Sequence, residues 1–366
     1  MTFHFGNIFF ELDLDGRNLN IDQLLKIHPN FYQLQFLPFL YKNEDEQVLV
    51  SNSPDSKLFK NCLLLEDLKS NQKQKIELWG NSDCINFFSN YFDISNHPCH
   101  HTTKLISKKT WLLPYIEKYL PEAKLISTAD QLSNLFSMSE FSPFVLKQPD
   151  GFSARGNIVI LKKEDLSINL FNKLLGFLIS SPLIYEPWME RSIDFSTQWH
   201  IDGNNITCLG ATQLLNSIKG GYQGNIFDPC DPFLKKNIPE IEMHYKTVLP
   251  LLQEIQQLGF TGNLGVDAFF YVDKENYYLQ PIVEINPRKT MGYVCVKIAE
   301  NNRFECPILL KLQEASKCSS PLLPSELRVQ HKQLLFKKNL EIQKVPGVLS
   351  HASFENTRGK TFKWHY

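Results

Sequence analysis

The segment PIVEINPRKTMG, from Pro281 to Gly292, places polar side chains on a hydrophobic strand pattern. Glu284 and Asn286 stand two residues apart, so on a strand their side chains point to the same face. A carboxylate and an amide side by side offer the oxygen ligands that Mg²⁺ prefers, and Arg288 follows at once. The segment therefore indicates a metal–phosphate site, with an ordinary exposed strand face as the alternative.

A preceding segment could complete this group of ligands. The runs GVDAFFYVD and YYLQPIVEIN indicate a β-hairpin that turns around KENY, residues 274–277. If these four residues form the turn, Asp267 lies directly opposite Glu284 and on the same face. Two facing carboxylates repel each other unless a cation lies between them. The hairpin thus predicts a Mg²⁺ site of Asp267, Glu284 and Asn286, which a register slip of one residue would abolish.

The segment VLKQPDGFSARGN is a second candidate, for phosphate binding. Lys147 ends a predicted strand, and Gly151–Gly156 forms a loop whose glycine spacing resembles a P-loop. The resemblance to a P-loop fails, because Asn157 and Ile158 stand where Lys and Ser or Thr are required. The loop could still cover phosphates with its backbone N–H groups while Lys147 supplies a positive charge. An ordinary glycine-containing hairpin is the alternative.

The segment IYEPWMERSID is a candidate hinge for a purine base. Pro187 removes a backbone donor and favours an extended connector after Glu186. Such a connector exposes backbone groups to a purine edge, while Glu186 can accept from an exocyclic amine and Asp194 can bind ribose hydroxyls. The alternative is a polar linker with Trp188 packed beneath it.

Length and composition limit the class of protein. The 366 residues predict two or three subdomains, and the net charge of −1 gives no electrostatic basis for binding nucleic acid. The acidic N-terminal segment does not resemble a signal peptide, and no apolar run reaches the roughly 18 residues of a membrane span. The eight cysteines are scattered without a CxxC pair, which favours reduced thiols. We therefore expect a cytoplasmic protein with no membrane and no nucleic-acid partner.

The first hundred residues alternate strand-like and helical patterns, which predicts a small open α/β domain. The strand-like runs cover residues 7–16, 31–40 and 76–81. Residues 106–124 then predict a helix with Ser107 as its N-cap.

Beyond residue 142 the pattern changes to strands joined by loops. Residues 216–228 are polar and rich in glycine, which predicts a loop. Residues 293–298, YVCVKI, have a strand-like composition, and the chain after Arg303 is expected to be a helical or covering segment.

The order of these features resembles the ATP-grasp superfamily, specifically its carboxylate–amine ligases. The resemblance covers residues 105–300, and GVDAFFYV with PIVEINPR carries most of it. It implies an α/β (α+β) fold that combines an N-terminal open α/β domain with a small lid subdomain and a C-terminal ATP-grasp subdomain. The implied boundaries are residues 1–105 for the N-terminal domain, 106–190 for the lid, 191–300 for the subdomain with the metal site, and 301–366 for a covering segment.

The resemblance also implies roles for individual residues. Lys147 and either Lys108 or Lys109, with Lys109 slightly favoured, would contact the ATP phosphates. The metal ligands would be Asp267, Glu284 and Asn286, although the family often has Glu where Asp267 stands. The implied nucleotide-binding residues are Lys109, Lys147, Gly151, Ser153, Gly156, Glu186, Pro187, Trp188, Met189 and Asp194. The implied catalytic residues are Arg288, Lys219 and Arg155.

The expected activity is an ATP-dependent ligation. A substrate carboxylate attacks the γ-phosphorus to give an acyl phosphate and ADP, and an amine then displaces phosphate. ATP and Mg²⁺, with Mn²⁺ as an option, would be the cofactors. Small carboxylates and amines, amino acids or peptides among them, would be the substrates, and a homodimer is one arrangement we consider. A kinase on the same fold and a catalytically silent nucleotide-binding module are the alternatives.

Overall fold

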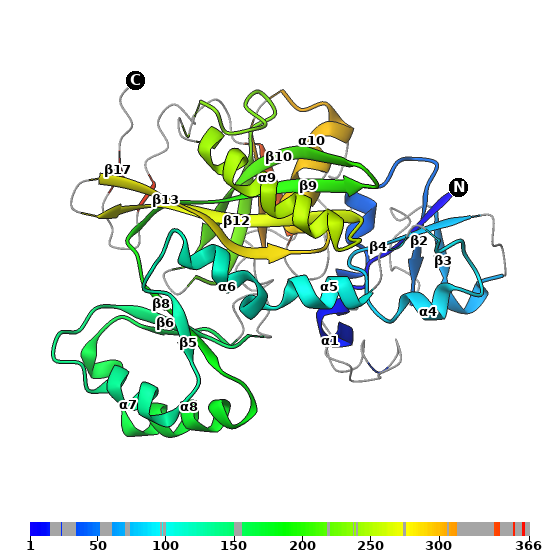
Figure 1. Ribbon diagram of the computed structural model, residues 1–366. Helices are drawn as coiled ribbons and strands as arrows, with labels where there is room; N and C mark the ends of the chain where they lie inside the picture. The colour runs from blue at the N-terminus through cyan, green and yellow to red at the C-terminus, as the bar shows by residue number, and fades with distance from the viewer. Residues whose placement is uncertain are drawn as a thin grey trace.

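The structure is a computed structural model of the chain. It describes residues 1–14, 23, 34–51, 61–69, 74–95, 97, 100–149, 156–217, 220–236, 238, 241–273, 276–305, 307–312, 340–344, 354–355 and 361–362. Three sheets of four or more strands organise most of these residues, and we call them the N-terminal sheet, the small sheet and the large sheet (Figure 1).

The N-terminal sheet has four parallel strands in the order β3-β2-β1-β4. Its elements are β1 (Thr2–Phe5), α1 (Phe10–Leu14), the 3₁₀ turn η1 (Leu37–Leu40), β2 (Gln47–Val50), β3 (Cys62–Leu64), the 3₁₀ turn η2 (Leu65–Asp67), β4 (Lys75–Leu78) and α4 (Ile85–Phe88). A parallel sheet with helical connections confirms the open α/β arrangement. The predicted strand over residues 7–16 is wrong, because this segment turns into α1.

Two helices link the N-terminal sheet to the rest: α5 (His100–Ser107) and α6 (Lys109–Glu117). The single helix predicted over residues 106–124 is therefore wrong at its start. Ser107 ends α5, where its hydroxyl donates to the carbonyl of Thr103, and the N-cap of α6 is Lys108. The break places Lys109 at the first position of α6.

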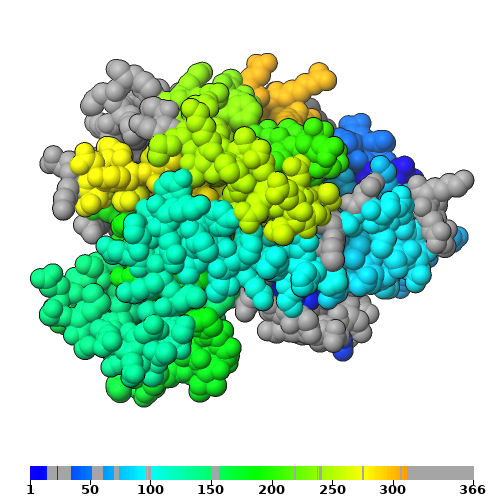
Figure 2. Space-filling model, in the orientation of Figure 1, coloured from blue at the N-terminus to red at the C-terminus, as the bar shows by residue number. Residues whose placement is uncertain are grey.

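The small sheet is antiparallel, with strand order β5-β8-β6-β7. Its elements are β5 (Lys124–Ile126), α7 (Ala129–Phe136), β6 (Phe144–Lys147), β7 (Ile158–Ile160), the 3₁₀ turn η3 (Lys163–Asp165), α8 (Ile168–Ser180) and β8 (Leu183–Pro187). Helices α7 and α8 pack on one face, where Leu132 and Leu174 are completely buried. The unit projects from the body of the molecule (Figure 2).

The large sheet is antiparallel, in the order β13-β12-β9-β10-β11-β14-β15. Its elements are β9 (Arg191–Asp202), β10 (Asn205–Asn216), β11 (Tyr222–Phe227), α9 (Ile241–Gln257), β12 (Gly262–Asp273), β13 (Asn276–Asn286), α10 (Met291–Asn302), β14 (Ile308–Leu312) and β15 (Leu340–Lys344). The short strands β16 (Phe354–Glu355) and β17 (Thr361–Phe362) form a separate pair. The loop predicted over 216–228 is wrong where β11 forms, and the strand-like run 293–298 lies in α10.

Strand alternation divides the large sheet into two faces. Along β9, the side chains of Phe195, Trp199 and Ile201 are buried on the face that α9 covers. Those of Ser196 and Gln198 point to the opposite face, where Gln198 accepts from the hydroxyl of Thr290, the N-cap of α10. The polar face toward α10 is where the site forms.

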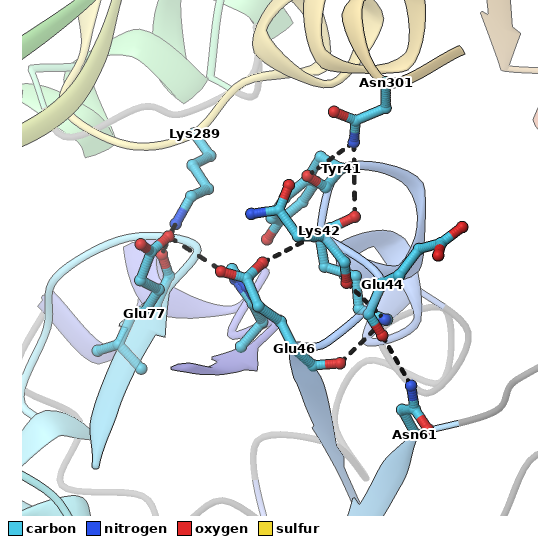
Figure 3. Close-up of polar contacts among 11 residues, drawn as sticks. Tyr41, Lys42, Glu44, Glu46, Asn61, Glu77, Lys289 and Asn301 are labelled. Carbon is cyan, nitrogen blue, oxygen red and sulfur yellow. Dashed lines mark hydrogen bonds and ion pairs between the residues drawn. The ribbon is translucent and has the colours of Figure 1, made fainter. Parts of the chain in front are cut away.

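A polar cluster joins the N-terminal sheet to the start of α10 (Figure 3). The buried ammonium of Lys289 donates to the carboxylate of Glu77, 3.0 Å away, and to the Leu78 carbonyl, 2.9 Å away. Farther along α10, the amide of Asn301 donates to the Tyr41 carbonyl at 3.2 Å. Since Lys289 follows Arg288, the N-terminal sheet fixes the chain directly beside the predicted metal ligands.

Candidate active site

A cavity of about 470 Å³ lies where the three sheets meet. Eight of the residues predicted from the sequence line it: Lys109, Lys147, Trp188, Asp194, Asp267, Glu284, Asn286 and Arg288. Glu186, Pro187 and Met189 are not among its lining residues. Gly151, Ser153, Arg155 and Lys219 lie outside the described residues. Gly156 is described, and its φ of +83° is a left-handed conformation that favours glycine.

An acidic pair, Asp267 and Glu284, lines this cavity. Asp267 on β12 is the direct partner of Glu284 on β13, as the sequence predicts. The Asn286 amide donates to the Asp267 carboxylate at 3.2 Å. Burial, together with the Glu284 carboxylate, raises the pKa of Asp267 to about 7. Burial would also raise the pKa of Glu284, but Lys109, Lys147 and Arg288 outweigh it and lower that pKa.

This electrostatic pattern fits a divalent cation. A cation between the two carboxylates would replace their repulsion by attraction, and Asn286 would add a neutral oxygen. The three predicted ligands are two acids and one amide. The described residues contain no group of three or more His, Cys, Asp or Glu side chains arranged for a metal. The predicted site agrees with this, because only two of its three ligands are of these types.

Two lysines approach the acidic pair from different elements. Lys109 at the start of α6 lies 3.0 Å from Glu284, nitrogen to oxygen. Lys147 at the end of β6 lies 2.6 Å from the Glu186 carboxylate, and both side chains are buried. The structure therefore places Lys109, and not Lys108, in the cavity. It also directs the Glu186 carboxylate at Lys147, so contact with a purine amine stays a prediction.

Arg191, which the sequence analysis did not single out, lines the cavity together with Trp188 and Asp194 of the candidate hinge segment. The Arg191 guanidinium lies 3.1 Å from the Asp194 carboxylate and covers the rings of Trp188 and Phe269, at 4.9 and 4.4 Å from their centroids. Within the described residues, the buried Nε of Arg191 and the buried Oδ1 of Asn157 have no hydrogen-bond partner. Both residues line the cavity, so these atoms are suited to a polar ligand.

The N-terminal sheet contributes residues that sequence reasoning also missed. Glu11 of α1 accepts from Nε of Arg288 at 3.0 Å, across 277 residues of chain. The same guanidinium donates to the Asn286 side-chain oxygen at 3.0 Å. Arg288 also pairs through its backbone with Gly80, next to Trp79. Only the folded chain reveals Glu11 and Trp79 as site residues, since no local motif surrounds them.

A largely buried polar network adjoins the acidic pair, since Ser196 is the strand partner of Asp267. The Thr290 hydroxyl donates to Gln198, and the Gln198 amide donates to Ser196. On the neighbouring strands, the Tyr222 hydroxyl donates to Asn225, whose amide donates to Thr212. Because these side chains bond to each other, they hold one geometry beside the acidic pair.

Comparison with known proteins identifies the fold. No protein-family model matches the chain, and no curated protein matches its sequence. Among solved structures, N5-carboxyaminoimidazole synthetase from Staphylococcus aureus is similar over 78% of this chain and 80% of that one, with a TM-score of 0.50 and 11% identity. Phosphoribosylamine–glycine ligase from Thermotoga maritima is similar over 79% and 80%, with a TM-score of 0.50 and 14% identity.

The chain has the ATP-grasp fold that the motifs predict. The two similar structures are a synthetase and a ligase, but at 11% and 14% identity the likeness shows the fold alone. No helix among the described residues is long and apolar enough to cross a membrane.

Proposed function

We propose that the protein is an ATP-dependent carboxylate–amine ligase. The observation that carries this proposal is the convergence of Lys109, Lys147, the Asp267–Glu284 pair and Arg288 on one cavity. These side chains suit a triphosphate, a divalent cation and a developing negative charge. The names of the two similar structures, a synthetase and a ligase, support the same class.

In this proposal the nucleotide lies between the small sheet and the large sheet. The ammonium groups of Lys109 and Lys147 bind phosphate oxygens, which requires each lysine to exchange its present carboxylate partner. Trp188 and Arg191 flank the base and ribose, and Asp194 accepts from the ribose hydroxyls. Asp267, Glu284 and Asn286 would hold Mg²⁺, which would neutralise phosphate charge when bound.

The reaction then proceeds in two displacements. A carboxylate oxygen of the substrate attacks the γ-phosphorus, the bond to the β-phosphate oxygen breaks, and ADP leaves. An amine next attacks the acyl carbon, its proton is lost, and inorganic phosphate leaves. Arg288, held by Asn286 and Glu11, is positioned beside the acidic pair to stabilise the transferring phosphoryl group.

The fate of the phosphoryl group tests the class of reaction. With ATP, Mg²⁺ and a panel of carboxylates and amines, we expect ADP and inorganic phosphate in equal amounts together with an amide. Hydroxylamine in place of the amine should trap the activated carboxylate as a hydroxamate. ADP accompanied by a stable phosphoester and no hydroxamate would establish a kinase instead. Nucleotide binding without release of ADP under any of these conditions would establish a catalytically silent nucleotide-binding module.

A further inference from the structure

The proposed function gives the Glu11 carboxylate, which holds Arg288, no contact with the nucleotide or the metal. Glu11 lines the cavity and lies 3.0 Å from Arg288, with its side chain 17% exposed. Asp267 and Glu284 are sufficient acids for the cation, and Asp194 serves the ribose. A further negative charge near a triphosphate is unfavourable unless it binds a positive group. Arg288 binds one oxygen of the Glu11 carboxylate, Oε1, and the second oxygen can accept from a positively charged group of a ligand in the cavity.

Glu11 is held in a fixed position. Just before α1, the buried Asn7 amide donates to the Gly80 carbonyl at 2.6 Å, and its oxygen accepts from the Trp79 amide at 2.8 Å. Near the end of α1, the Asp13 carboxylate accepts from the Cys84 amide at 2.7 Å. These bonds tie both ends of the helix to the segment that links β4 to α4, so little ordering is required when a ligand binds Glu11.

The wall around the pair is apolar. Ile8, Leu34, Leu37 and Trp79 of the N-terminal part line this side of the cavity, and Met291 lines it from α10. Leu37 and Trp79 are buried. Such a surface accepts a hydrocarbon group and gives it no hydrogen bond.

We propose that the carboxylate substrate is an α-amino acid with an apolar side chain. Its carboxylate binds Arg288 and its ammonium binds Glu11, so that the zwitterion lies against the ion pair with each charge facing its opposite. The side chain of the amino acid packs between Trp79 and Leu37. This inference rests on the proposed ligase function and adds the class of its first substrate.

Analogues that lack one charge test the zwitterion directly. Binding to the full chain with Mg²⁺ and ADP is measured by calorimetry for leucine, for isocaproate, which lacks the amino group, and for isoamylamine, which lacks the carboxylate. We expect leucine to bind at least about tenfold more tightly than either analogue, as expected for a buried charge-assisted hydrogen bond. Phenylalanine, hydrocinnamate and phenethylamine form a second matched set.

The variant Glu11→Gln removes the charge and keeps an oxygen that can still accept from Arg288. Leucine should then bind no better than isocaproate, while the affinity for isocaproate is retained. Glu242→Gln, in an exposed ion pair with Lys235 on the surface, is the control and should keep the wild-type preference. Equal binding of leucine and isocaproate by the wild type, no binding of either amino acid, or a preference that survives Glu11→Gln would overturn the inference.

Failure of the inference and failure of the proposed function give different results. If a carboxylate without an amino group yields ADP and a hydroxamate while amino acids do not, the ligase stands and the substrate class is wrong. If no carboxylate yields ADP and a hydroxamate, the ligase itself is wrong, whichever molecules bind.

Discussion

Asp267 and Glu284 face each other only because the register of their hairpin shifts along its length. Near the turn, Asp273 pairs with Asn276 and Phe269 pairs with Gln280. Continued without a shift, that register would place Ile282 opposite Asp267. From Phe269 to Asp267, β12 advances by two residues, while the paired residues of β13 advance by four, from Gln280 to Glu284. A regular ladder would advance by two residues on both strands. The acidic pair thus depends on the irregular segment of β13.

Two neighbouring residues account for the irregular segment. Pro281 has no backbone N–H, so it cannot donate to a regular ladder, and β13 is an edge strand where proline is tolerated. The buried amide of Gln280 donates to the Ile282 carbonyl at 2.8 Å, which satisfies a group that the shift removes from the ladder.

The first prediction tests this segment. Gln280→Met should lower the free energy of unfolding by about 1 kcal/mol, because the buried Ile282 carbonyl loses its donor. It should also raise the Mg²⁺ concentration needed for half-maximal ATP turnover, because the position of Glu284 is less fixed. Urea unfolding and a Mg²⁺ titration measure the two effects.

The control for that experiment is Gln256→Met on α9. This change removes an exposed hydrogen bond from the Gln256 amide to the Gly203 carbonyl. This variant should leave the Mg²⁺ dependence unchanged. If Gln280→Met also leaves it unchanged, the side chain does not position the acidic pair.

The second prediction concerns the metal. Glu284→Gln should keep the fold and reduce ATP turnover on the order of a hundredfold or more, because a neutral amide holds Mg²⁺ weakly against phosphates. Circular dichroism checks the fold, and ADP release at millimolar Mg²⁺ measures the turnover. Glu242→Gln is the matched surface control, and wild-type turnover by Glu284→Gln would exclude Glu284 as a ligand.

The third prediction separates the structural and functional roles of Lys147. Lys147→Met leaves the buried Glu186 carboxylate unpaired and should lower the free energy of unfolding by about 3–5 kcal/mol. The double variant Lys147→Met/Glu186→Gln should recover most of that loss. Urea unfolding of the two variants measures the difference.

Nucleotide binding should not recover with stability. We expect weak ADP affinity by calorimetry in the double variant, and little rescue in Lys147→Arg, whose planar group replaces a compact charge poorly. A double variant that is stable and binds ADP as the wild type does would show that Lys147 serves folding alone.

Local sequence patterns predicted the elements that carry the metal ligands. Strand alternation located β12 and β13, and the spacing of Glu284 and Asn286 predicted their shared face. The opposition of Asp267 to Glu284 was also predicted, although from a turn at 274–277 that differs from the observed Asp273–Asn276 pairing. The shift at Pro281 compensates for that difference, and no local rule revealed it.

Tertiary burial explains what the sequence did not predict. YVCVKI has the β-branched composition of a strand, yet it lies in α10, where Val294, Cys295 and Val296 are completely buried. A helix buried on most sides lacks the amphipathic pattern by which helices are recognised. Glu11 was missed because a distant element brings it to the cavity. Arg191, in contrast, stands inside the candidate hinge segment, where no local pattern marks its role.

The fourth prediction concerns the ion pair between Lys289, which follows Arg288 in the chain, and Glu77 of the N-terminal sheet (Figure 3). The Lys289 ammonium is the main cause that lowers the pKa of Glu77 to about 2. A carboxyl whose pKa is depressed by folding stabilises the protein above its unfolded pKa, and this contribution is lost as pH falls through the folded pKa. The free-energy difference between wild type and Glu77→Gln should therefore be constant above about pH 5 and shrink between about pH 4.5 and pH 2. Because the Glu77 side chain is 48% exposed, solvent screening limits the difference to about 1 kcal/mol.

Urea unfolding from pH 7 to pH 3 measures this difference, and Lys289→Met provides the reference background. In that background Glu77→Gln should have a much smaller effect, because the pair with Lys289 is already absent and only the 3.7 Å contact of Glu77 with His4 remains. Lys289→Met alone should also raise the Mg²⁺ concentration needed for half-maximal ATP turnover. The reason is that the Lys289–Glu77 ion pair holds the chain segment that carries Asn286 and Arg288. A difference between wild type and Glu77→Gln that stays constant down to pH 3, or that persists undiminished without Lys289, would show that the contact contributes nothing to the docking of the N-terminal sheet on the site.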